Sequence, residues 1–157
     1  MIDDKLHWTP HLKLCKAKLS SSLFAIKSAK NVLPKKLLRT LYYALMYPYI
    51  DYGIMLWGAA AKSLIKPLEV LQKKAIRNIM GTNYKTPTLP LFKELRILSF
   101  QDVFNLNMCK FMYDYHQRTL PDPLNDIFTD TSNIHEHFTR QASAPHVKVD
   151  EQHKLIG

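Results

Sequence analysis

The sequence predicts an all-α protein, a small bundle of four or five helices with an irregular C-terminal tail. The chain has 157 residues, 46% of them hydrophobic, which is enough to form the core of a single domain. Apolar residues recur at spacings of three and four over long stretches, which is the period of an amphipathic helix. No stretch alternates apolar and polar residues as a half-buried strand does.

The first helix is expected over residues 10–30. Thr9 and Pro10 pair a capping oxygen with a residue that lacks an amide hydrogen, a combination typical of a helix start. One apolar stripe is formed by Leu12, Cys15, Leu19, Leu23 and Ile26. The lysines that lie mostly off this stripe are Lys13, Lys16, Lys27 and Lys30. The helix is therefore apolar on one side and basic on another.

The second helix begins at Leu33-Pro34 and enters an unusual stretch at 41–58. This stretch is rich in tyrosine and carries one charge, Asp51, together with Pro48 in its middle. It is almost long enough to span a bilayer, but the charge, the proline and the central tyrosines argue against that. Because apolar residues occupy almost all sides of the helix that this stretch would form, we expect the central core helix of the protein, which should kink or restart at Pro48.

Lys66-Pro67 is expected to open the third helix or to lie in its first turn, and Gly81, a favourable C-cap residue, is expected to end it. Its inward face consists of Leu68, Leu71, Ala75, Ile76 and Ile79. The basic residues of the opposite face are Lys73, Lys74 and Arg77.

Weaker helical patterns follow. A short helix is predicted over 89–95, a longer one over 100–118 with Ser99 and Asp102 as a capping box, and a turn over 124–128. The resulting division is a lead-in at 1–8, a three-helix bundle at 9–80, a helical connection at 81–128 and a flexible tail at 129–157.

Charge is concentrated in the N-terminal half. Residues 1–80 hold fourteen Lys and Arg against four Asp and Glu, whereas residues 81–157 hold eight against nine, within a net charge of +9. Such a basic half indicates a polyanion or an anionic membrane surface as partner. The alternative is ordinary solvated lysine on helix surfaces.

Residues that catalysis or metal binding would use are scattered, so no catalytic, metal or cofactor site is expected. The four glycines form no phosphate loop. The candidates weighed and set aside in favour of solvated or hydrogen-bonded side chains are Asp3, Asp4, His7, His11, Asp51, His135, Glu136 and His137. Cys15 and Cys109 are expected to be buried thiols and not a disulfide. With a polar start and no secretory signal, we expect an intracellular protein, nuclear or cytoplasmic, that is neither secreted nor membrane-spanning.

An ordered series of short motifs resembles a known family. The series is Asp3-x-Lys5-Leu6-x-Trp8-x-x-His11, LYYAL at 41–45, YPYIDYG at 47–53, LWG at 56–58, LQKKAIR at 71–77, PLFKELRIL at 90–98, FMY at 111–113, LP at 120–121 and FTR at 138–140. It resembles the region that follows the palm in reverse transcriptases of non-LTR retrotransposons, over about residues 2–145.

The resemblance implies a helical thumb and the connection after it, without the catalytic palm. In that family an aromatic-x-Asp-Asp motif of the palm holds two metal ions, and this chain has no such motif, since Asp3-Asp4 stand in a post-palm context. The fragment is therefore expected to have no polymerase activity alone. A thumb contacts the backbone of a template–primer duplex, RNA–DNA or RNA, so the nucleic-acid-binding candidates are Lys13, Lys16, Lys27, Lys30, Lys73, Lys74 and Arg77.

Two other functions stay open. A co-opted protein–protein interaction module of the same ancestry would use an exposed apolar surface, which would otherwise rest on the missing palm and fingers or drive self-association. An unrelated small enzyme would require Asp51, His7 and His11 to meet in one cleft.

Overall fold

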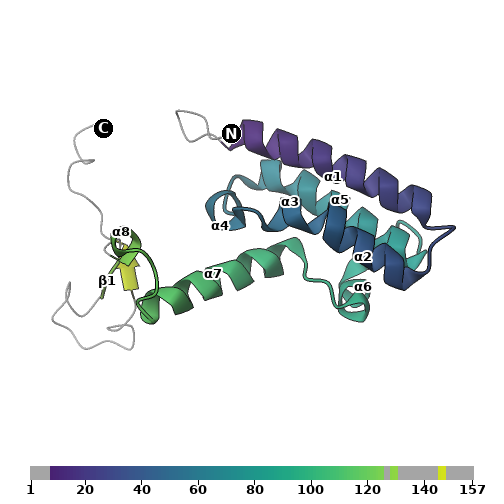
Figure 1. Ribbon diagram of the computed structural model, residues 1–157. Helices are drawn as coiled ribbons and strands as arrows, with labels where there is room; N and C mark the ends of the chain where they lie inside the picture. The colour runs from purple at the N-terminus through teal and green to yellow at the C-terminus, as the bar shows by residue number, and fades with distance from the viewer. Residues whose placement is uncertain (1–7, 126–127, 131–144, 148–157) are drawn as a thin grey trace. The chain divides into compact units, whose positions relative to one another are not determined.

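The computed structural model describes residues 8–125, 128–130 and 145–147. These residues form two compact units, and the division falls between Met108 and Cys109. The elements are α1 (Thr9–Ala29), α2 (Lys35–Leu45), α3 (Tyr47–Asp51), α4 (Ile54–Trp57), α5 (Lys62–Met80), α6 (Thr88–Leu95), α7 (Phe100–His116), α8 (Asp122–Asn125), β1 (Phe128–Asp130) and β2 (Pro145–Val147) (Figure 1). The expected all-α fold is confirmed. The division predicted from the sequence, with a bundle ending at residue 80, stays a prediction.

In the first unit, α1 packs mainly on α5 and also on α2, and α5 contacts α2 and α6. Figure 1 shows α1, α2 and α5 side by side. The fully buried large side chains at their centre are Leu19, Ile26, Leu38, Tyr42, Met46, Ile50, Ile54, Trp57, Leu68, Ile76 and Ile79. The stripe predicted for the first helix is buried apart from Leu23, which is half-buried.

One predicted cap and one predicted helix start are wrong. Thr9 is already helical and Trp8 holds the N-cap position without a side-chain hydrogen bond, so Pro10 alone marks this start correctly. The third helix begins at Lys62 and not at Lys66-Pro67. Pro67 therefore lies inside the helix, where it removes the hydrogen bond that an amide would donate to the Ser63 carbonyl.

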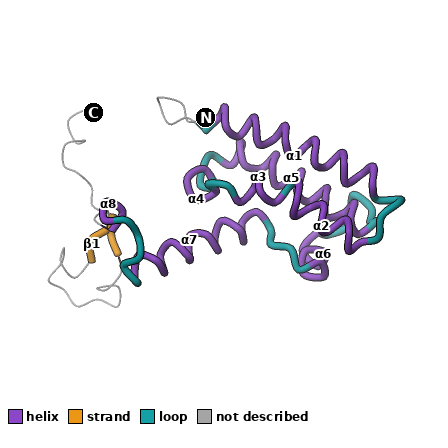
Figure 2. The backbone as a smooth tube through the Cα atoms, viewed as in Figure 1, coloured by secondary structure: helices purple, strands orange, loops and turns teal. Residues whose placement is uncertain are grey.

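The stretch 41–58 is not one kinked helix but parts of three, α2, α3 and α4, separated by short breaks (Figure 2). Pro48 lies in the first turn of α3, where its missing N–H costs nothing, so of the two predicted outcomes the chain restarts and does not kink. Gly53 then adopts φ 64°, a left-handed conformation that suits glycine, and holds the N-cap position before α4. No helix in the described part of the chain is both long and apolar enough to cross a membrane.

Complete burial of this stretch is also wrong. Tyr42, Met46 and Ile50 point into the core, whereas Tyr49 is partly exposed and Tyr52 is 78% exposed. Each of these helices thus has a buried side and an exposed side, and the exposed side still carries tyrosines and leucines.

A buried glutamine joins four segments of the first unit. The Gln72 amide nitrogen donates to the Tyr42 hydroxyl (2.8 Å) and the Leu98 carbonyl (3.0 Å), and its amide oxygen accepts from the Phe100 amide (2.8 Å). Gln72 therefore fixes α5 to α2, to the loop after α6 and to the start of α7.

Close packing at Gly58 and two predicted caps shape the remaining turns. A Cβ at Gly58 would overlap the Ile54 carbonyl oxygen and the Phe104 ring, so only glycine fits there. Gly81 caps α5 with φ 66°, as predicted. The predicted capping box is confirmed, because Ser99 Oγ donates to Asp102 Oδ2 (2.6 Å) and accepts from the Asp102 amide (3.3 Å).

The second unit contains the end of α7, then α8 and an antiparallel pair of short strands in which Phe128 faces Val147. The turn predicted at 124–128 is replaced by α8, which ends at Asn125. Most of the predicted flexible tail, 129–157, lies outside the described residues. The strands are three residues long and too short to give a period in the sequence.

Candidate nucleic-acid interface

The helices of the first unit carry an almost unopposed positive charge. α1 and α2 contain lysine or arginine and no acidic residue, and α5 has five basic residues with Glu69 as its one acid. Among the described residues the one ion pair joins Lys35 to Glu94 at 3.9 Å, and both side chains are exposed. The lysines of α1 and α5 are therefore not neutralised by carboxylates of the described chain.

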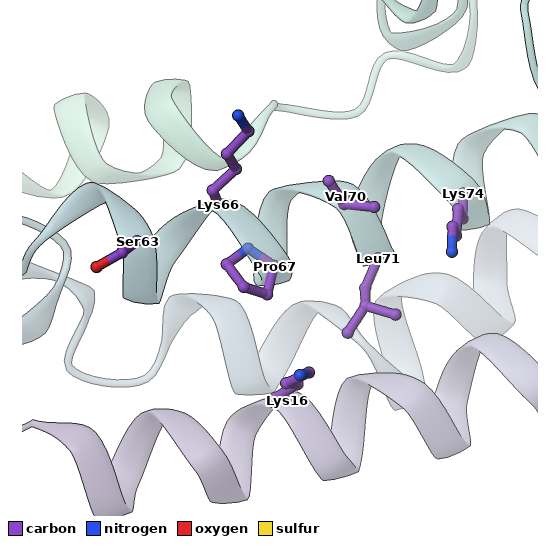
Figure 3. Close-up of a pocket in the computed structure, with 7 residues that line it drawn as sticks. All are labelled: Lys16, Ser63, Lys66, Pro67, Val70, Leu71 and Lys74. Carbon is purple, nitrogen blue, oxygen red and sulfur yellow. The ribbon is translucent and has the colours of Figure 1, made fainter.

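Two predicted residues from different helices meet in one groove, here called the α1–α5 groove. It has a volume of about 350 Å³ and is lined by Lys16 of α1 and by Ser63, Lys66, Pro67, Val70, Leu71 and Lys74 of α5. Figure 3 shows Pro67 and Leu71 on the side of α5 that faces α1, with Lys16 rising from α1 below them. The groove thus combines an apolar floor with ammonium groups at its rim.

Lys66 was missed by sequence reasoning because it was assigned to the opening of the helix. It lies in the second turn of α5 and extends away from α1 in Figure 3, toward a neighbouring depression lined by Lys62, Glu69 and Gln101. Lys66 stands seven residues before Lys73, which is about two helical turns, and this spacing could have placed it on the same face of the helix.

The other predicted lysines are exposed but do not line the groove. Lys13 and Lys27 share the face of Lys16, since they stand three residues before and eleven residues after it, close to whole helical turns. Lys30 is the C-cap residue of α1, and Lys73 is exposed on α5. The structure brings Lys16 and Lys74 together and leaves the remaining lysines as extensions of the same two helices.

Arg77 differs from the other predicted residues. It is half-buried, and its Nε donates to the Thr86 carbonyl at 3.0 Å, which ties the loop after α5 to the helix. Part of its hydrogen-bonding capacity is therefore used inside the protein.

An apolar pocket of about 420 Å³ lies on the other side of α1, between α1 and α3. Its lining residues are His11, Leu14, Cys15, Pro48, Tyr49 and Tyr52. Burial lowers the pKa of His11 and raises the pKa of the Cys15 thiol, whose sulfur lies 3.3 Å from His11 Nε2. Burial and the raised pKa keep the thiol protonated, which does not suit a nucleophile.

Asp51 has the hydrogen-bonded environment that the sequence indicated and does not line this pocket. Its Oδ1 accepts hydrogen bonds from Asn107 Nδ2 (3.0 Å) and from the Tyr47 hydroxyl (3.4 Å). Burial is the main cause that raises the pKa of Tyr47, and the negative charge of Asp51 raises it further. Asp51 and His11 are therefore in different surroundings, and His7 lies outside the described residues.

The remaining candidates do not form a site that the structure describes. Within residues 8–125, 128–130 and 145–147, no group of three or more His, Cys, Asp or Glu is placed to hold a metal. Asp3, Asp4, His135, Glu136 and His137 lie outside those ranges. Both cysteines are free, and Cys15 is buried as predicted. The predicted burial of Cys109 is wrong, because it lies on an exposed side of α7.

Comparison with curated proteins finds two relatives, both from Drosophila melanogaster. The chain is 23% identical over 130 residues to the "Probable RNA-directed DNA polymerase from transposon X-element", which covers 80% of this chain and 14% of that protein. It is 27% identical over 104 residues to the "Probable RNA-directed DNA polymerase from transposon BS", which covers 64% of this chain and 12% of that protein.

The chain thus spans less than a sixth of the length of these relatives. No protein-family model matches it. No solved structure matches it either. The resemblance predicted from the ordered motifs is nevertheless confirmed: over most of its length this chain is similar to a segment of the reverse transcriptases of non-LTR retrotransposons.

Proposed function

We propose that the chain is a thumb-like piece of a retrotransposon reverse transcriptase that holds a template–primer duplex by its backbone and does not polymerise alone. The observation that carries this proposal is the α1–α5 groove, where Lys16 and Lys74 come from two helices to one place without an acidic partner. The palm and fingers of a complete polymerase would supply the metal ions and the chemistry.

The physical chemistry of the groove suits phosphates. An ammonium group on a flexible stem is a compact point charge that follows a phosphate backbone without reading the base sequence. The apolar floor of Pro67, Val70 and Leu71 suits the sugar edge between successive phosphates. An RNA–DNA duplex near A-form presents a wide, shallow minor groove, and the backbone that borders it is accessible to lysines on helices.

The test is salt-dependent binding to a blunt RNA–DNA duplex. Reversing Lys16 and Lys74 together (Lys16→Glu, Lys74→Glu) is expected to lower the affinity at 0.1 M salt by about tenfold per lost phosphate contact and to reduce the salt slope by about one per contact. Lys93→Glu, at an exposed lysine of α6, makes half of this change of charge elsewhere and is expected to have less than half of the effect on the logarithm of the affinity.

Equal affinities of the double variant and Lys93→Glu would refute the proposed interface. Arg77 is left unchanged in this test, because its hydrogen bond to Thr86 would confuse binding with folding. Nuclear or cytoplasmic location stays a prediction.

A second candidate function, a protein–protein interaction module, is favoured by the apolar pocket between α1 and α3. Leu14 is 54% and Tyr52 78% exposed beside it, which leaves apolar surface uncovered. In a complete polymerase this surface would rest on the palm, and in the isolated chain it would drive self-association. Sedimentation at low and high salt separates the two functions, since salt weakens phosphate contacts and does not weaken apolar association.

A further inference from the structure

A short loop after α5 presents an aromatic ring to solvent. Tyr84 lies in the loop at 82–87 and is 74% exposed, while the Lys85 ammonium lies 5.7 Å from the centre of its ring. Tyr84 contributes nothing to the buried core, so its large apolar face is available to a ligand.

Backbone hydrogen bonds fix this loop to the helix. Gly81 reverses the chain in a left-handed conformation, and the Thr82 amide donates to the Arg77 carbonyl at 3.0 Å. The Thr86 amide donates to the Asn83 carbonyl (3.1 Å), which closes a turn with Tyr84 and Lys85 at its two central positions. The Arg77 side chain holds the far end of the turn through the Thr86 carbonyl. A ring carried on such a turn loses little conformational entropy when it binds.

The turn extends the basic row of α5. Lys73, Lys74 and Arg77 precede it, Lys85 belongs to it, and no acidic residue occurs over residues 70–93. A nucleic acid held by the lysines of α5 therefore meets an aromatic ring, with a cation against it, at the C-terminal end of that helix.

We propose that Tyr84 stacks on an unpaired base at the end of a duplex whose backbone lies along α1 and α5. This inference rests on the proposed function and adds base stacking to it. Bases inside a duplex are covered by their neighbours and held by their pairs, so a protein ring stacks on a base where the strand is unpaired, as in an overhang beside a duplex end. Stacking tolerates any base, because each base has a π face, so the protein gains a preference for a junction and not for a sequence.

The experiment compares a blunt RNA–DNA duplex with the same duplex carrying a three-nucleotide overhang that contains 2-aminopurine, prepared with the overhang at either the 5′ or the 3′ end. The wild-type protein is expected to bind one overhang duplex about tenfold more tightly than the blunt one and to quench the 2-aminopurine fluorescence. Tyr84→Ala is expected to lose both effects and to bind the blunt duplex as the wild type does, and Tyr84→Phe is expected to keep both. Tyr113→Ala, at a residue 64% exposed on α7, is the matched control.

Two results would overturn the stacking. One is unchanged quenching in Tyr84→Ala, and the other is an equal loss of affinity for the blunt and overhang duplexes. If Lys16→Glu with Lys74→Glu weakens binding to the blunt duplex while Tyr84→Ala changes nothing, the stacking fails and the proposed function survives. If the lysine variant binds as tightly as the wild type, the proposed function itself fails. Circular dichroism of Tyr84→Ala is expected to match the wild type, since the side chain lies outside the core.

Discussion

Replacing Gln72 by leucine is expected to destabilise the protein even though it adds an apolar side chain to the core. Gln72 is 1% exposed and forms hydrogen bonds with the Tyr42 hydroxyl, the Leu98 carbonyl and the Phe100 amide. Leucine has a similar volume but cannot form hydrogen bonds, so these polar groups lose their partner. Each buried polar group without a partner costs about 1–3 kcal/mol. The Tyr42 hydroxyl stays neutral because burial raises its pKa, so it gains no compensating charge interaction. The expected loss is about 2–5 kcal/mol, a large part of a typical free energy of unfolding.

A double-mutant cycle separates the network from simple loss of packing. Tyr42→Phe alone removes one partner and is expected to cost about 1–2 kcal/mol, because it leaves one amide hydrogen of Gln72 unpaired. Gln72→Leu with Tyr42→Phe is expected to cost less than the two single changes added together, by about 1–2 kcal/mol. Urea denaturation followed by helical circular dichroism gives each free energy, with the slope checked for two-state behaviour.

The control for Gln72→Leu is the same change at Gln101, an exposed residue of α7 that bonds to Asn105. It is expected to change stability by no more than about 0.5 kcal/mol. A Gln72→Leu variant as stable as Gln101→Leu, or additive effects in the cycle, would refute the idea that a buried polar network fixes α5 to its neighbours.

Further expected outcomes concern the glycines and pH. Gly58→Ala is expected to lower the free energy of unfolding by about 1–3 kcal/mol, because the added methyl group overlaps Phe104. Gly81→Ala is expected to cost less, about 1 kcal/mol, because Gly81 has open space around it and only its left-handed backbone disfavours alanine. Thermal unfolding compares the two, and the reverse order would contradict the packing argument. Burial lowers the pKa of His11 below its ordinary 6.5, so the unfolded chain takes up a proton more readily, and stability is expected to fall as the pH drops below about 6.5. His11→Gln is expected to lose this part of the pH dependence in urea denaturation at pH 8 and 5.5, and an unchanged pH dependence in the variant would assign it to other groups.

The long helices were predictable because each repeats its apolar residues over several turns. The residues assigned to the inward face of α5, for example, are buried except for Leu71, which is half-buried at the edge of the α1–α5 groove. The breaks in 41–58 were not predictable from period alone. They depend on Gly53 taking a left-handed conformation and on the Trp57 indole donating to the Tyr52 carbonyl at 2.8 Å, a contact that exists only after the chain has turned.

The candidate interface shows the same division between local and tertiary information. Helical period placed Lys16 and Lys74 on outer faces, but which basic residues share one groove depends on how α1 packs against α5. Arg77 followed the same period and nevertheless became half-buried, because the loop that it holds returns to the helix at Thr86. The sequence of residues 71–77 alone does not predict this contact with the loop.

The motifs that reveal the relationship to reverse transcriptases have packing roles in this structure, and that affects where function should be sought. Gln72 of LQKKAIR connects buried segments, and Gly58 of LWG makes room for Phe104. A motif built for packing identifies the scaffold and thereby the ancestry, but it does not mark the surface that meets a partner. Of the groove lysines, Lys16 and Lys66 lie outside every one of these motifs, and Lys74 is an exposed residue of LQKKAIR. Variants of the packed motif residues Gln72 and Gly58 are therefore expected to change the free energy of unfolding. Variants of the groove lysines are expected to change binding at unaltered stability, so measuring both quantities on each protein separates the scaffold from the interface.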